Sequence, residues 1–230
     1  MAAQTLPSTL DLILDLSKIK SLTPQQIEYL WITKASSEIP ASKSTLRESD
    51  TNSRISSIIP SSQFKSLELL VAKNKQFILP VQNPATQQLD IHYLQWQVPP
   101  SQSSDYLQLL VIKLADYQRL GAAAPPHTVI YFYKDLSEPY AGNNPEDDEK
   151  PLQNESLAKG LVLMKGEILE KSAITVEQLQ FLILNLQKFY GVLDGDSGLR
   201  NERLRLLMAF NKGDPSFDFN KLVELAMNTK

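Results

Sequence analysis

Two histidines are the residues of this chain best suited to acid–base chemistry or metal binding. The 230 residues contain only His92 and His127, and they contain no cysteine. An imidazole becomes a catalytic base or a metal ligand only when further polar groups converge on it. The two histidines fall in separate predicted strands, DIHYLQWQV and HTVIYFY. We therefore interpret each of them as a strand-end or sheet-face residue.

The segment DGDSG, at residues 194–198, is the other fragment that suggests chemistry. Asp-Ser-Gly occurs around the nucleophile of trypsin-like proteases, but Leu199 follows here without the Gly-Pro of those all-β enzymes. A calcium-binding loop would need glycine and glutamate where this chain has Leu199 and Arg205. We interpret the segment as a turn between two helices. The acidic run at 146–149 is interpreted as a solvated loop.

The motifs of the common enzyme classes do not occur in the sequence. It has no phosphate-binding G-x-x-x-x-G-K-[ST] loop, no G-x-G-x-x-G, no H-E-x-x-H and no G-x-S-x-G. The lack of cysteine excludes disulfides and thiolate metal sites. We expect a protein that is not an enzyme and that has no cofactor and no metal. A hydrolase whose site is assembled from distant residues is the alternative.

Composition narrows the classes of partner. The net charge of −3 and the pI near 5.5 argue against broad nucleic-acid binding, which needs clustered positive charge. No apolar run approaches the roughly 18 residues of a membrane span, so no membrane insertion is expected. The first 20 residues contain no arginine and do not read as a targeting presequence, which predicts a cytosolic protein or a trimmed, mature one.

Helices are predicted at both ends of the chain. The stretch LDLILDLSKI places Leu10, Ile13 and Leu14 on one face, and TPQQIEYLWITK begins with a capping box of Thr23 and Gln26. Residues 36–53 are rich in Ser, Thr and charge, which predicts a loop or tether. The last third contains VEQLQFLILNLQKFY, capped by a second Thr-x-x-Gln box, and FDFNKLVELAMN. Between them, RLRLLMAFN is interpreted as a helix, with a strand as the alternative. The last helix is predicted to face the core with Phe219, Leu222, Val223 and Ala226.

Six strands are predicted between these helices: RISSIIP, QFILPV, DIHYLQWQV, DYLQLLVIKL, HTVIYFY and GLVLMKGEI. Pro80 places QFILPV at a sheet edge or a bulge, because proline has no N–H for a ladder. Gly121, Pro125 and Pro126 end a helical turn and force extended geometry before HTVIYFY. That strand is apolar on both faces, as in a central strand covered on each side. We predict an α+β fold: a single domain with a central, largely antiparallel sheet of about six strands, flanked by helices.

Several segments together resemble a known family. GAAAPPHTVIYFYKDL and, beyond an acidic insertion, KGLVLMKGEI are similar to the central signature of the mitochondrial ATP synthase assembly factor family. The residues that match this signature are Gly121, Ala123, Ala124, Tyr131, Tyr133, Asp135, Leu136, Lys159, Gly160, Leu161, Val162, Leu163 and Met164. TPQQIEYLWITK, IIPSSQFKSLELLVAKNKQFILPV, LQWQ and LQKFYG resemble further family segments in the same order. The resemblance covers about residues 10–225.

The resemblance implies a chaperone that acts without nucleotide. Its expected client is the unassembled β subunit of ATP synthase, which it would protect from aggregation in the mitochondrial matrix until the α subunit replaces it. The chain is expected to be monomeric, with N-terminal helices and a tether at 1–53 and a client-binding α+β domain at 54–230. The acidic insertion at about 137–158 is long where the family has a tight turn. Trp96, Tyr131 and Tyr133 are the expected partner-binding residues. A scaffold for another client is the alternative within this class.

Overall fold

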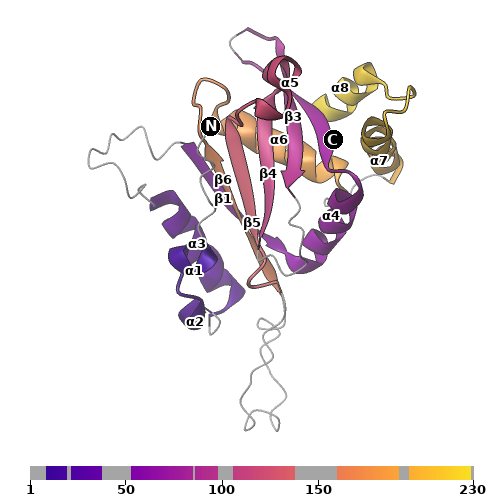
Figure 1. Ribbon diagram of the computed structural model, residues 1–230. Coiled ribbons are helices and arrows are strands. Elements are labelled where there is room, and N and C mark those ends of the chain that lie inside the picture. The colour runs from indigo at the N-terminus through magenta and orange to yellow at the C-terminus, as the bar shows by residue number, and fades with distance from the viewer. Residues whose placement is uncertain are drawn as a thin grey trace.

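The computed structural model describes residues 9–19, 22–37, 53–84, 86–97, 106–137, 160–191 and 197–228. The elements follow in the order α1 (Leu10–Ile13), α2 (Leu16–Ile19), α3 (Pro24–Ser37), β1 (Arg54–Pro60), α4 (Ser61–Lys73), β2 (Gln76–Gln82), β3 (Leu89–Gln97), β4 (Tyr106–Lys113), α5 (Leu114–Leu120), η2 (Gly121–Ala123), β5 (Thr128–Tyr133), β6 (Leu161–Ile168), α6 (Val176–Phe189), α7 (Ser197–Lys212) and α8 (Phe219–Met227). The strands form one antiparallel sheet in the order β1-β6-β5-β4-β3-β2 (Figure 1). The predicted α+β single domain is confirmed.

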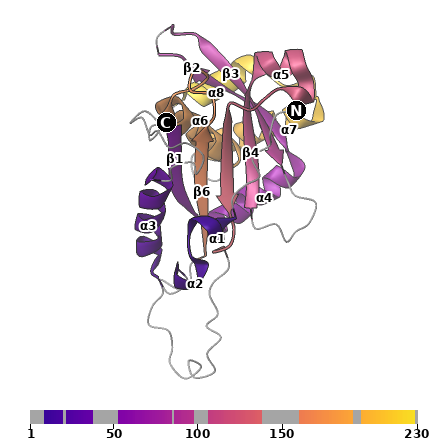
Figure 2. The ribbon, with the colours of Figure 1, turned by 60° about the vertical axis from the view of Figure 1, so that its left-hand side comes forward.

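Helices cover both faces of this sheet. The helices α4, α6, α7 and α8 lie on one face, and α1, α2 and α3 gather on the other, over β1 and β6 (Figures 1 and 2). The short α5 lies on the second face as well, where Tyr117 stacks on Tyr93 of β3 with ring centroids 3.8 Å apart. Because strand side chains alternate between faces, each strand contributes to two apolar layers.

Strand β5 lies in the middle of both layers, as its sequence predicts. All six of its residues are buried. Ile130 and Phe132 point toward α4 and α6, while Tyr131 and Tyr133 point toward the N-terminal helices. The helical turn before this strand ends at Gly121, as predicted. Gly121 has a φ of 56°, in the left-handed region that favours glycine.

The N-terminal helices are part of the same core. Trp31 is buried, packs edge-on against Tyr133 and donates its indole N–H to the Met164 carbonyl oxygen at 3.0 Å. The predicted capping box is present, with the Gln26 N–H donating to Thr23 Oγ1 at 3.3 Å and the Thr23 N–H donating to Gln26 Oε1 at 2.9 Å. The helix predicted from residue 10 is divided into α1 and α2. The tether that would separate residues 1–53 from the rest lies mostly outside the described residues, so that boundary stays a prediction.

The C-terminal helices match the prediction except on one face of α8. The box of Thr175 and Gln178 caps α6. In α8 the buried residues are Leu222, Leu225 and Ala226, whereas Phe219 is 40% exposed. The inward prediction for Phe219 is wrong: this residue begins the helix directly after the N-cap Asp218, one turn before the first buried residue, Leu222. None of the described helices is both long and apolar enough to cross a membrane.

Replacing Trp31 with alanine should destabilise the whole domain by about 3–5 kcal/mol, because the change leaves a large cavity and removes the bond to Met164. Urea unfolding followed by circular dichroism measures this loss. Tyr29→Ala is the matched control on the same helix, since Tyr29 is 73% exposed and its loss should change stability by under about 0.5 kcal/mol. Equal, small effects of both changes would show that α3 does not belong to the cooperative core.

Candidate functional site

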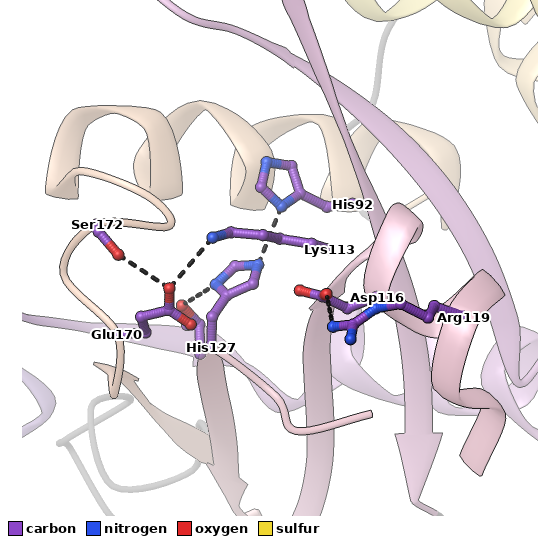
Figure 3. Close-up of polar contacts among 8 residues, drawn as sticks. His92, Lys113, Asp116, Arg119, His127, Glu170 and Ser172 are labelled. Carbon is purple, nitrogen blue, oxygen red and sulfur yellow. Dashed lines mark hydrogen bonds and ion pairs between the residues drawn. The ribbon is translucent and has the colours of Figure 1, made fainter. Parts of the chain in front are cut away.

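The structure brings the two histidines together at one end of the sheet. His92 lies in β3, and His127 directly precedes β5. His92 Nδ1 and His127 Nε2 are 3.0 Å apart, so one ring donates an N–H to the other. The second nitrogen of His127 lies 2.9 Å from Thr128 Oγ1. All three side chains are buried. Figure 3 shows the two histidine rings facing each other. The sequence prediction of separate strand-end or sheet-face positions is correct for each histidine, but it missed their contact.

Burial keeps both imidazoles neutral. It lowers the pKa of His92 to about 4, with a smaller contribution from the positive charge of Lys113. The pKa of His127 is lowered to about 3, first by burial and then by the neighbouring His92 and Lys113. A general base works best with a pKa near the working pH. A buried pair that is neutral at pH 7 is better suited to holding strand ends together than to proton transfer.

An ion pair closes the cluster on its exposed side. Lys113 Nζ lies 3.2 Å from Glu170 Oε1, and the Ser172 hydroxyl donates to the same carboxylate oxygen at 2.9 Å (Figure 3). These two contacts lower the pKa of Glu170. The backbone N–H groups of Leu169 and Glu170 both donate to the His127 carbonyl oxygen, at 2.8 and 3.1 Å. The cluster therefore joins the end of β4, the start of β5 and the turn after β6.

The described residues contain no group of three or more His, Asp or Glu side chains arranged to hold a metal ion. The DGDSG turn and the acidic run at 146–149 lie outside the described residues, except for Ser197 and Gly198, which begin α7. The insertion at 137–158 is described only at Ser137. The interpretations of these segments, and the expected absence of metal and cofactor, stay predictions.

The three aromatic residues expected at the partner surface lie in two separate apolar layers. Trp96 packs against Phe132 and Tyr190, with ring centroids 5.5 and 5.6 Å apart, on the face covered by α4 and α6. Tyr131 and Tyr133 lie on the opposite face, beneath the N-terminal helices. All three side chains are buried in this structure. Their role in partner binding stays a prediction.

Exposed apolar side chains occur elsewhere, and two of them lie next to each other on α3. Tyr29 is 73% exposed and Ile32 is 44% exposed, and their three-residue spacing puts them on one helix face. This face is turned away from the one that packs on the sheet through Ile27 and Trp31. The sequence prediction does not include this pair, because the apolar stripe predicted to face the core lies on the other side of the helix. An apolar pair outside that stripe was the available signal.

The fold and this site define an α+β protein with a doubly covered antiparallel sheet and a neutral histidine pair tied into its end. A family model described as ATP11 protein matches residues 2–223 of the chain. The chain therefore belongs to the ATP11 protein family, the mitochondrial ATP synthase assembly factor family that its segments resemble.

A curated relative agrees with this assignment. "Protein atp11, mitochondrial" of Schizosaccharomyces pombe is 27% identical over 215 residues, which make up 94% of this chain. The same residues cover 61% of the relative, so the chain spans about three fifths of that protein's length.

Acidification should destabilise the fold through the histidine pair. Both folded-state pKa values lie below the ordinary value of 6.5, so the unfolded chain binds more protons as the pH falls below that value. The contribution of the two histidines to the free energy of unfolding is therefore complete above about pH 6.5. It is lost as the pH falls toward 4, by about 1.4 kcal/mol for each unit of pKa shift. Urea unfolding between pH 7 and pH 5 measures how the free energy of unfolding changes with pH. This range lies above the one in which carboxylates titrate.

The double variant His92→Leu/His127→Leu is the control for this prediction. It removes both histidines of the chain and should flatten the stability profile between pH 7 and pH 5. A wild-type profile as flat as that of the double variant would contradict the burial of neutral imidazoles.

Proposed function

We propose that this protein is an assembly chaperone that binds the unassembled β subunit of ATP synthase in the mitochondrial matrix. It holds the subunit until the α subunit takes its place. The observation that carries the proposal is the family match over residues 2–223, which spans every described element except the end of α8. The mitochondrial name of the fission yeast relative supports the proposed location.

The physical task requires a surface, not a reaction. An unassembled subunit exposes an interface that would otherwise self-associate, and a surrogate partner must cover about 800 Å² of it on each side. The contact needs an apolar centre and a polar rim, with an affinity low enough for the α subunit to displace the chaperone. The sequence has no phosphate-binding loop to couple release to nucleotide hydrolysis. We propose that competition alone drives release from a monomeric chaperone.

The exposed face of α3 is the proposed direct contact. Tyr29 and Ile32 present apolar area without any rearrangement, and aromatic anchors of this kind dominate binding energy at many interfaces. Contact with Tyr131 and Tyr133 would require displacement of the helices that cover them, and contact with Trp96 would require displacement on the other face. In this proposal the three buried aromatics act after such a movement or support the surface from beneath.

Purified protein should suppress the aggregation of isolated ATP synthase β subunit at about one chaperone for each client, with no effect of added ATP. Light scattering of diluted, unfolded β subunit gives the measurement, and a general chaperone serves as the positive control. Adding the α subunit should release the client. Continued aggregation at a several-fold excess of this protein, where the control succeeds, would reject the proposed function.

The double variant Tyr29→Ser/Ile32→Ser should weaken binding of the β subunit by about tenfold or more, because it removes the apolar centre of the proposed contact. Leu69→Ser is the matched control, since Leu69 is 72% exposed on α4, at the opposite face of the sheet. Titration calorimetry of each variant with β subunit gives the affinities. If the α3 variant binds like the wild type, or if Leu69→Ser weakens binding as much as the α3 variant does, the contact lies elsewhere.

A further inference from the structure

The two edges of the sheet differ in how their hydrogen-bonding groups are satisfied. Strands β1 and β2 are the edge strands (Figure 2). In an antiparallel pair, successive residues turn their N–H and C=O groups alternately toward the partner strand and away from it. Every second residue of an edge strand therefore presents a free donor and acceptor, which another chain can use for strand addition.

Several outward groups of the β2 edge are blocked by the protein itself. The Trp96 N–H donates to the Lys75 carbonyl oxygen at 2.8 Å, so the groups of Gln76, Ile78, Pro80 and Gln82 point away from β3. The side-chain amide of Asn211 bonds both backbone groups of Gln76, at 3.1 and 2.6 Å. Gln178 donates to the Gln82 carbonyl oxygen at 3.2 Å. Pro80 has no N–H to offer.

The same alternation assigns the outward groups of β1. The Ser61 N–H donates to the Gly160 carbonyl oxygen at 2.9 Å, one step beyond the pairing of Pro60 with Leu161. Leu161 in turn donates to Leu136, on the side away from β1. Ile55, Ser57 and Ile59 thus bond to β6, and the N–H and C=O groups of Arg54, Ser56 and Ile58 face outward.

In the described parts of the chain, the outward groups in the middle of β1 lack the proline and the side-chain amide contacts that β2 has at Gln76, Pro80 and Gln82. Among the described residues, neither the Ser56 N–H nor the Ile58 N–H has a hydrogen-bond acceptor. Within the part of the chain that the structure describes, the side-chain contact at these groups is the Ser57 hydroxyl, which donates to the Ile58 carbonyl oxygen at 3.3 Å. A proline or a charge on an edge strand hinders the addition of another strand. In β1 these residues are Pro60 and Arg54, which lie at its two ends, and the Arg54 guanidinium is held by Glu167 at 3.4 Å. The five residues between them, ISSII, carry no charge.

We propose that the β1 edge is a docking site for an extended segment of the client, which adds to the sheet as a seventh strand. A row of backbone donors and acceptors at strand spacing recognises another peptide backbone. The uncharged edge favours an uncharged segment. Its apolar side chains would lie beside Ile55 and Ile59 on one face of the sheet and beside Ile58 on the other. The α3 helix packs on β1, so the edge and the exposed pair Tyr29 and Ile32 belong to neighbouring elements. The identity of the client as the ATP synthase β subunit rests on the proposed function.

Ser56→Pro is the decisive variant. It deletes an outward N–H that the fold does not use, and edge strands tolerate proline when the missing N–H faces solvent. Ser56→Ala removes the hydroxyl and keeps the N–H, so it is the matched control. We expect Ser56→Pro to bind isolated β subunit at least fivefold more weakly than Ser56→Ala, whose affinity matches the wild type. Circular dichroism and the unfolding midpoint verify that both variants fold.

Amide hydrogen exchange of the full wild-type chain, read by NMR, provides a test that needs no variant. The outward amides of Ser56 and Ile58 should exchange rapidly in the free protein and become protected when β subunit is added. The inward amides of Ser57 and Ile59 should be protected in both states. If the wild type binds no β subunit, the proposed function and this inference both fall.

If the subunit binds but Ser56 and Ile58 stay unprotected, or Ser56→Pro binds like Ser56→Ala, the inference alone is overturned. Protection that grows with the concentration of this protein alone would identify a second copy as the occupant and would also overturn it.

Discussion

The structure depends on the burial of β5 from both faces. An antiparallel sheet usually keeps one face toward water, and a strand that is apolar on both faces is stable only when helices cover each of them. Ile130 and Phe132 require α4 and α6, while Tyr131 and Tyr133 require α1, α2 and α3. The N-terminal helices are therefore not an appendage. They form the second wall of the core, fastened by Trp31 to the backbone of β6.

The histidine pair follows from the same constraint. His92 and His127 are buried at the end of the doubly covered sheet. Because burial disfavours the charged form, both rings remain neutral. Each needs a hydrogen-bond partner inside the protein, because an unsatisfied buried polar group is costly. They satisfy each other and Thr128, and the ion pair of Lys113 and Glu170 covers them. The arrangement uses the two residues best suited to catalysis as structural connectors between β3 and β5.

A protein whose sheet faces are both occupied by its own helices must meet a partner through helix surfaces or sheet edges. On the β2 edge, Asn211, Gln178 and a proline block the outward groups of three residues, whereas the middle of β1 has no such contacts among the described residues. The exposed apolar pair on α3 lies on a helix that packs against that open strand. Both features support the proposal that the client is held at the β1 side of the molecule.

Local sequence patterns determined much of this protein. The six strands, the two Thr-x-x-Gln caps, the edge position of Pro80 and the central position of HTVIYFY all follow from alternation, capping chemistry and proline geometry, which act within a few residues. The ordered segments also determined the family. The tertiary structure alone decided which residues meet across the sheet. His92 and His127 are 35 positions apart, and Trp96 is separated from Tyr131 and Tyr133 by the thickness of the sheet. Strand order and register set these relations, because a shift of one residue turns every side chain to the opposite face, and no short pattern encodes that pairing.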